Sequence, residues 1–341
     1  MFTRILALVG CVSSALGGNW VGWRGDNGLG ITPETGLPLK WSATENVLWK
    51  VPLPERGNST PVVWKDKIFL TQAVGERRTV MCLERKTGKT LWQNGTSYKE
   101  EEETHETNPY CSASPATDGE RVIAWFGSAG VFCYDMAGKE LWRVDLGKQA
   151  HIWGYASSPL IDGDLCIIYF GPGKGAYLTA LNKKTGSEVW RVNEPAIQKR
   201  PRTDGFRGQE EKGILCSFSS PIILQSGGRT ELVMAYPQLI CAYDPKTGKE
   251  LWRCDGLNEL IYTSPIAGDG VVVAMGGFYG TTVAVKAGGN GDVTETHRLW
   301  RHERTKNRLG SGVIHDGHVY ILNTEGVAEC FELNSGKMVW Q

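Results

Sequence analysis

The chain has 341 residues, which is enough for one large all-β domain or for two ordinary domains. Its 37 basic and 37 acidic side chains give a formal net charge of zero, so the composition predicts neither a nucleic-acid partner nor binding to an acidic membrane surface. Beyond the first residues, no segment has the roughly 18 consecutive apolar residues that a membrane-spanning helix requires.

Residues 1–17 have the pattern of an export signal. Arg4 precedes an apolar run from Ile5 to Leu16, and small residues are spaced for cleavage before Gly18. We therefore expect a signal peptide and a mature protein outside the cytoplasm, either periplasmic or secreted. A lipid anchor at Cys11 is the alternative, since Leu-Val-Gly-Cys resembles a lipoprotein box, although the apolar stretch before it is short.

After an N-terminal extension (18–36), one phrase recurs to the end of the chain. Each copy combines a strand, a Thr-Gly-Lys type of turn and a second strand that ends in tryptophan, as in CLERKTGKTLWQ and AYDPKTGKELWR. The tryptophans at the ends of the six copies are Trp92, Trp142, Trp190, Trp252, Trp300 and Trp340. Their spacings, from 40 to 62 residues, fit four short strands per repeat, which is the size of a propeller blade.

A second phrase lies between consecutive tryptophans and predicts the first strand of each repeat. Its copies begin at Asn58, Ser112, Ser157, Ser219, Thr263 and, more weakly, Ser311. Most contain Ser-Pro or Thr-Pro and continue through an Asp-Gly type of turn into a β-branched run, the pattern of a hairpin. Residues 37–341 are therefore predicted to form an all-β propeller with six complete four-stranded blades.

The N-terminal part is expected to add one more strand to the ring. Residues 46–51 (NVLWKV) match only the last strand of a repeat, and the chain stops one residue after Trp340. A closed ring would then need further strands after Gln341. We expect the chain to be a fragment of a seven- or eight-bladed propeller.

The pattern Ala-x-Asp-x-x-Thr-Gly-x-x-x-Trp resembles the tryptophan-docking motif of the pyrroloquinoline-quinone-like (PQQ-like) propellers. This family includes quinoprotein dehydrogenases and the outer-membrane assembly propeller lipoprotein. The opening WVGWRGDNGLG from Trp20 also resembles the start of many exported PQQ-like repeat proteins. The resemblance implies that the repeat tryptophans lie flat on the neighbouring blade and join blade to blade. It does not imply a function, because one fold hosts unrelated activities.

The cysteines follow the repeat and do not indicate a disulfide framework. Cys82, Cys133 and Cys330 stand where Ala180 and Ala242 stand in other copies. A position filled by alanine or cysteine indicates a small buried slot, and equivalent slots in different blades exceed the roughly 7 Å Cα separation that a disulfide spans. We expect mostly free, buried thiols.

Aromatic side chains precede the first strand of several blades, where the chain comes nearest to the propeller axis. The candidate binding residues are Tyr110, His151, Trp153, Tyr155, Phe218 and Tyr262. Such a ring stacks on a flat ligand or on peptide side chains, or it merely caps the interior of the propeller, and the sequence leaves both interpretations open.

Two insertions on the same rim carry opposite charge. One, 94–110, is acidic, and the other, 192–218, is basic and supplies Arg200 and Arg202 as further candidate contacts. Either these loops grip a polar partner or their charges are simply solvated.

Two functions remain open. Quinoprotein dehydrogenases as a family use a vicinal disulfide, a Ca²⁺ ion and an aspartate base, whereas this chain has no adjacent cysteines and no Asp-rich loop typical of Ca²⁺ binding. The histidines have no zinc-ligand spacing. We therefore expect a non-catalytic extracytoplasmic scaffold that binds a protein or polysaccharide partner, without cofactor or metal. The alternative is a PQQ-dependent oxidoreductase acting on an alcohol or sugar, with PQQ and Ca²⁺.

Overall fold

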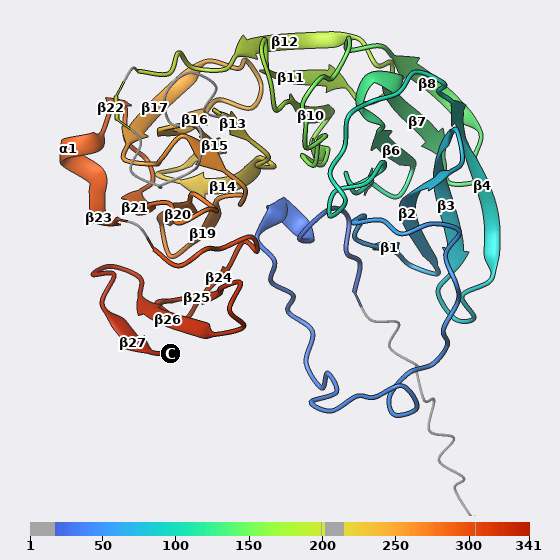
Figure 1. Ribbon diagram of the computed structural model, residues 1–341, viewed down its shortest axis with the longest axis horizontal. Coiled ribbons are helices and arrows are strands. Elements are labelled where there is room, and N and C mark those ends of the chain that lie inside the picture. Colours follow the sequence, from blue (N-terminus) through green and yellow to red (C-terminus); the bar gives the residue numbers. More distant parts are fainter. Residues whose placement is uncertain (1–17, 199, 202–214, 304) are drawn as a thin grey trace, which may run out of the picture.

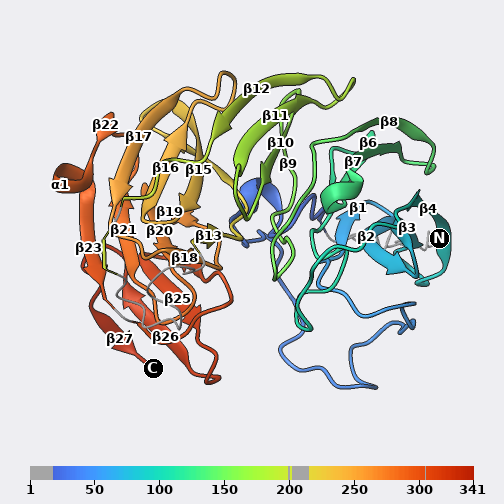
Figure 2. The same ribbon diagram turned by 45° about the horizontal axis from the view of Figure 1, so that its top comes forward.

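The computed structural model describes residues 18–198, 200–201, 215–303 and 305–341, and these contain six sheets built on one plan. In each sheet four consecutive strands pair antiparallel, which confirms the predicted all-β architecture. We call these sheets blades 1 to 6. Figures 1 and 2 show them following one another around an arc, from β1–β4 in blue and cyan to β24–β27 in red.

Blade 1 comprises β1 (Val62–Trp64), β2 (Lys67–Val74), β3 (Arg77–Glu84) and β4 (Thr90–Ser97). Blade 2 comprises β5 (Ala116–Thr117), β6 (Arg121–Trp125), β7 (Val131–Asp135) and β8 (Glu140–Val144). Blade 3 comprises β9 (Leu160–Asp162), β10 (Leu165–Phe170), β11 (Tyr177–Asn182) and β12 (Glu188–Asn193).

Blade 4 comprises β14 (Ile222–Ser226), β15 (Arg229–Tyr236), β16 (Leu239–Tyr243) and β17 (Glu250–Asp255), with β22 (Gly291–Asp292) added in parallel at its outer edge. Blade 5 comprises β19 (Ile266–Gly268), β20 (Val271–Met275), β21 (Thr282–Lys286) and β23 (Arg298–His302). Blade 6 comprises β24 (Val313–His315), β25 (His318–Leu322), β26 (Ala328–Glu332) and β27 (Met338–Trp340).

The few helices are short. They are the 3-10 turns η1 (Asp26–Gly28) and η2 (Gly127–Ala129) and the single-turn helix α1 (Thr294–His297). None of the helices in the described residues is long and apolar enough to cross a membrane. The expected signal peptide and Cys11 lie in residues 1–17, outside the described part of the chain.

Four of the six repeat tryptophans join neighbouring blades by the same type of hydrogen bond, as expected, whereas Trp340 is 47% exposed. Trp92, Trp142, Trp190 and Trp300 each donate the indole N–H to a main-chain carbonyl in a turn of the following blade, at 2.7–3.2 Å. The ring lies directly on the glycine of that turn. A Cβ atom on Gly138, for example, would be 2.5 Å from the ring of Trp92, and its φ of 88° is itself a glycine conformation.

Trp49 docks in the same way, although residues 46–51 form no strand, contrary to expectation. Its indole N–H donates to Arg85 O at 2.9 Å, and a Cβ atom on Gly88 would be 2.6 Å from its ring. No described strand lies beside residues 46–51 to complete a ladder, so tryptophan docking occurs there without strand pairing.

The small slot predicted from the cysteines lies directly across the ladder from the docking tryptophan. Cys82 pairs with Trp92 and Cys133 with Trp142, while Ala180 pairs with Trp190. A bulky side chain there would displace the indole. The eight cysteines among the described residues are free and buried, and burial raises the pKa of the Cys82 and Cys133 thiols to about 12.

The residue before each repeat proline links the blades close to the axis. In five successive pairs, its main-chain N–H donates to the side-chain oxygen of the equivalent residue in the next blade. The bonds run from Thr60 to Ser114, Ser114 to Ser158, Ser158 to Ser220, Ser220 to Ser264 and Ser264 to Ser311, at 2.7–3.0 Å. We call these six residues the serine belt. It gives a physical role to the Ser-Pro phrase beyond starting a strand.

Replacing Ser220 by alanine is expected to destabilise the protein by about 1–3 kcal/mol, because the buried Ser158 N–H loses its acceptor. Urea unfolding followed by circular dichroism measures the change. Ser97→Ala removes an exposed hydroxyl and should stay within about 0.5 kcal/mol of wild type. Equal effects of the two substitutions would contradict a role for the belt.

Residues 20–30, which we call the axial pin, cross the centre of the arc, where Figure 1 places η1. Trp20 and Val63 of β1 exchange two main-chain hydrogen bonds, both at 2.8 Å, and Thr117 N–H of β5 donates to Val21 O. Gly28 lies against Ile222 of β14, where a Cβ atom would be 2.9 Å from the Ile222 side chain. The pin therefore contacts the inner strands of blades 1, 2 and 4.

Arg24 connects the pin to blade 6. Its guanidinium donates to the carbonyl oxygens of Ser311 at 2.7 Å and Gly312 at 2.6 Å, and also to Gly28 O and Leu29 O within the pin. Burial lowers the pKa of this guanidinium to about 10. The group therefore remains charged at neutral pH and is held by carbonyl dipoles.

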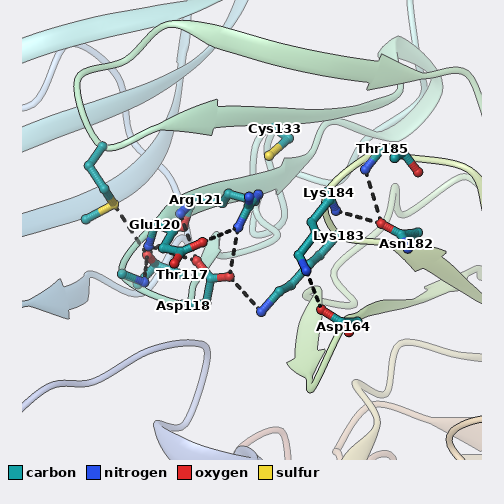
Figure 3. Close-up of polar contacts among 12 residues, drawn as sticks. Thr117, Asp118, Glu120, Arg121, Cys133, Asp164, Asn182, Lys183, Lys184 and Thr185 are labelled. Atoms are coloured by element: carbon teal, nitrogen blue, oxygen red, sulfur yellow. Dashed lines mark hydrogen bonds and ion pairs between the residues drawn. The ribbon is translucent and has the colours of Figure 1, made fainter.

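Asp118 ties blade 2 to blade 3 (Figure 3). Its Oδ1 accepts the main-chain N–H groups of Glu120 and Arg121, and its Oδ2 lies 2.9 Å from Lys183 Nζ. Burial by itself raises the pKa of the Asp118 carboxyl. The hydrogen bonds from Lys183 and the two amides outweigh burial, so the pKa lies below its ordinary value of 3.8.

Acid is expected to weaken this contact between blades. Because the folded-state pKa is lowered, the carboxylate contributes full stability at neutral pH and loses it as pH falls below about 4. The urea midpoint of the wild type should therefore fall more steeply than that of Asp118→Asn between about pH 5 and pH 2. Parallel curves would show that Asp118 contributes nothing to acid sensitivity.

Candidate functional site

A pocket of about 440 Å³ opens on the face where the loops enter the first strand of each blade. This volume lies within the usual range for pockets that bind small ligands. We call this cavity the aromatic pocket. The described residues that line it are His105, Thr107, Asn108, Trp153, Ala156, Phe218, Tyr262, Phe278, Asn307 and Leu309. They come from the loops between β4 and β5, β8 and β9, β20 and β21, and β23 and β24, together with the segments that lead into β14 and β19.

Two short strands hold the innermost rings. β13 (Cys216–Ser217) pairs in parallel with β18 (Leu260–Ile261), and the Phe218 N–H then donates to Ile261 O at 2.8 Å. Phe218 and Tyr262 follow these strands directly, so the pairing places their ring centroids 6.0 Å apart. The backbone, rather than a flexible loop, therefore sets the spacing of these two rings.

Trp153 completes a contacting cluster with these rings. Its centroid is 6.3 Å from that of Phe218 and 6.2 Å from that of Tyr262, within the usual range for aromatic pairs. His151 lies edge-on to Phe218 at 5.4 Å, and its Nδ1 accepts the Trp153 N–H at 3.2 Å. Burial lowers the pKa of the His151 imidazole, so this group is neutral at neutral pH.

Of the aromatic candidates, the structure brings Trp153, Phe218 and Tyr262 into the pocket, with His151 packed against two of them. Tyr155 does not reach it, because this side chain is buried against Trp125 at 4.7 Å between blades 2 and 3.

Tyr110 also lies outside the lining. Its ring lies under the Arg78 guanidinium at 3.7 Å, and its hydroxyl donates to Glu102 O. Both contacts fix the loop before β5. The structure thus gives Tyr110 a supporting position beside the pocket.

Arg200 does not line the pocket. Arg200 Nη1 lies 2.9 Å from Asp255 Oδ2, and Arg200 Nε lies 3.7 Å from Glu259 Oε1. These contacts attach its loop to blade 4. Arg202 lies outside the described residues.

Several lining residues were not among the candidates. For two of them, Ala156 and Leu309, the repeat does contain a signal, which is their distance from the repeat proline or its equivalent. Phe218 and Tyr262 stand three residues before the repeat proline, and so does Ala156, while Leu309 holds the equivalent place before Gly312. Phe278 lies in a loop between second and third strands that the repeat phrases do not cover.

Asn108 was not among the candidates, and the structure gives it a positioning role. Its side-chain amide donates to Trp153 O at 2.6 Å and to Tyr155 O at 3.2 Å. These bonds join the loop before β5 to the loop before β9. They hold the Trp153 segment at the pocket.

An acidic loop supplies part of the pocket lining. Within the loop that supplies His105, Glu100 pairs with Lys148 at 2.7 Å, and Glu102 accepts the Ser128 N–H. Glu101, Glu103 and Glu106, which we call the acidic edge, are exposed and form no ion pair with any described residue. The acidic edge therefore gives this loop a local excess of negative charge.

The described lining residues do not fit an anionic quinone such as PQQ, which is a tricarboxylate. Among the described lining residues there is no arginine or lysine to pair with its carboxylates. The described cysteines are buried and none is adjacent to another in sequence. The described residues also contain no group of three or more His, Cys, Asp or Glu side chains arranged to hold a metal ion.

Comparison with known proteins identifies the repeat. A family model described as outer membrane protein assembly factor BamB matches residues 76–341. A relative in Yersinia pestis, outer membrane protein assembly factor BamB, is 23% identical over 274 residues, covering 79% of this chain and 62% of the relative. The chain thus spans about three fifths of the length of that relative.

Solved structures agree on the fold. The crystal structure of BamB from Moraxella catarrhalis superposes with a TM-score of 0.58 at 16% identity, covering 86% of this chain and 76% of that one. A europium-containing methanol dehydrogenase superposes with a TM-score of 0.52 at 11% identity, covering 95% of this chain and 85% of that one. At these identities the likeness concerns the propeller fold alone.

Proposed function

Because this chain belongs to the outer membrane protein assembly factor BamB family, we propose that it is a non-catalytic, extracytoplasmic scaffold that binds a protein partner through its aromatic pocket. The family name and that of the Yersinia pestis relative support a role in assembling outer membrane proteins. They give no support to a polysaccharide partner or to a lipid anchor at Cys11.

The composition of the aromatic pocket is the observation that carries the proposal. Trp153, Phe218 and Tyr262 present large, rigid, amphipathic rings, the residue types that dominate protein-binding surfaces. Among the described lining residues, His105 is the one imidazole, and there is no carboxylate, lysine or cysteine. The pocket thus has the means to bind an apolar side chain and few of the groups that acid–base chemistry requires.

A photocrosslinker tests the proposal in the intact cell. With p-benzoylphenylalanine in place of Ala156, which lines the pocket, we expect a discrete crosslinked protein that mass spectrometry identifies. The same group in place of Ser187, in the exposed turn at the opposite end of blade 3, is the matched control and should give no such product. Identical products at both positions, or none at Ala156, would contradict binding at the pocket.

The oxidoreductase alternative has its own direct test. Titration of the purified protein with PQQ, with and without Ca²⁺, followed by calorimetry and absorbance, is expected to show no saturable binding. Stoichiometric binding at micromolar or lower concentration would replace the scaffold proposal by a quinoprotein function.

A further inference from the structure

The walls of the aromatic pocket are shaped for a large apolar side chain. Trp153, Phe218 and Tyr262 form one contacting cluster, and Phe278 and Leu309 add two further apolar groups. A cavity of about 440 Å³ holds more than one side chain, so an occupant would bring part of its main chain with it.

The loop that supplies His105 to the pocket carries negative charge that no described residue compensates. Glu100 and Glu102 of the acidic loop already have partners, whereas the three glutamates of the acidic edge have none among the described residues. Glu103 and Glu106 flank His105 in sequence, and His105 lines the pocket. Carboxylates in this position favour a positively charged occupant and oppose an acidic one.

One wall also offers a hydrogen-bond acceptor. Asn307 lines the pocket, and its buried Oδ1 has no hydrogen-bond partner among the described residues. Buried acceptors are usually paired in folded proteins, so this atom suits an N–H donor of the occupant once the Asn307 side chain turns toward the pocket. A main-chain amide or a lysine ammonium supplies such a donor, whereas a carboxylate does not.

From these three features we propose that the pocket binds a protein segment in which a large apolar side chain is flanked by lysine or arginine. The apolar side chain packs on the Trp153 cluster, and the flanking cations face the acidic edge. This inference rests on the proposed function, since it names the chemistry of the partner segment at that same pocket.

Three short peptides test the proposal by calorimetry on the full chain. The probes are acetyl-Gly-Lys-Phe-Lys-Gly-amide, the same peptide with glutamates in place of lysines, and the same peptide with serine in place of phenylalanine. We expect the first to bind at least about tenfold more tightly than either of the others, and its affinity to fall as salt screens the acidic edge.

Two variants separate the contributions of charge and apolar contact. The triple substitution Glu101→Gln, Glu103→Gln, Glu106→Gln should abolish the advantage over the glutamate peptide, whereas Phe218→Ala should abolish the advantage over the serine peptide. Neutralising three exposed glutamates elsewhere, with Glu45→Gln, Glu295→Gln and Glu332→Gln, is the charge-matched control and should change neither.

The possible results separate a failure of the proposed partner chemistry from a failure of the proposed scaffold function. If the Ala156 crosslinker captures a partner but the three peptides bind equally or not at all, the scaffold stands and the proposed chemistry is wrong. If the lysine peptide binds with the expected preference but Phe218→Ala leaves its affinity unchanged, the site is elsewhere and the inference also fails. Loss of both crosslinking and peptide binding overturns both.

Discussion

Replacement of Trp252 by alanine is expected to lower the free energy of unfolding by about 3–5 kcal/mol. This indole is fully buried and packs in one cluster with Val272, Val283 and Val293 between blades 4 and 5. Removing it leaves a cavity that the surrounding strands cannot close. Unlike the other docking tryptophans, it also donates its N–H to a side chain, Glu231 Oε2 at 2.9 Å, so the variant leaves a buried carboxylate with one partner fewer.

Urea unfolding monitored by circular dichroism measures this loss. The control is Trp41→Ala, because that indole is 72% exposed and its removal should cost no more than about 0.5 kcal/mol. An unchanged urea midpoint for Trp252→Ala would contradict the assignment of this residue to the contact between blades.

Arg308→Met is expected to cost about 3–5 kcal/mol, because it strands a carboxylate in the interior. The guanidinium is 1% exposed and lies 2.9 Å from Glu329 Oε2, and it also donates to Thr282 Oγ1 at 2.6 Å. Glu329 is itself 4% exposed, so neither charge has water as an alternative partner.

The chain supplies a matched control two residues away. Lys306 and Glu325 form an ion pair at 3.0 Å in which both side chains are about half exposed, so Lys306→Met should cost at most about 1 kcal/mol. The double variant Arg308→Met, Glu329→Leu should recover most of the loss, because it removes both charges together. A double variant no more stable than Arg308→Met would show that the lost packing, rather than the unpaired charge, sets the cost.

The repeat allowed most of the fold to be predicted because its signals are local. A glycine turn, the tryptophan after it and the small residue opposite that tryptophan belong to neighbouring strands of one ladder, as Cys82 and Trp92 show. The serine belt and the bonds of Arg24 depend on which residues meet around the axis. Sequence spacing along one repeat does not contain that information.

The lining of the aromatic pocket could be predicted in part for the same reason. Phe218 and Tyr262 were found because they directly precede a recognisable phrase, and their equivalent position lines the pocket in other blades too. Tyr155 stands one residue further from its proline and turns into the core. A one-residue offset before a strand reverses the direction of a side chain, and aromatic character alone does not reveal it.

The axial pin has a consequence for how the molecule unfolds. An array of blades held only by nearest-neighbour interfaces behaves as a one-dimensional chain, which frays from its ends. Arg24 bonds to residues 287 and 288 positions further along the chain, so forming that contact closes a very long loop and costs loop entropy. This cost is offset only when most of the blades between the two ends of the loop are folded. Once closed, it links blade 6 through the pin to blades 1, 2 and 4. The first and last blades are then expected to melt together, as one cooperative unit.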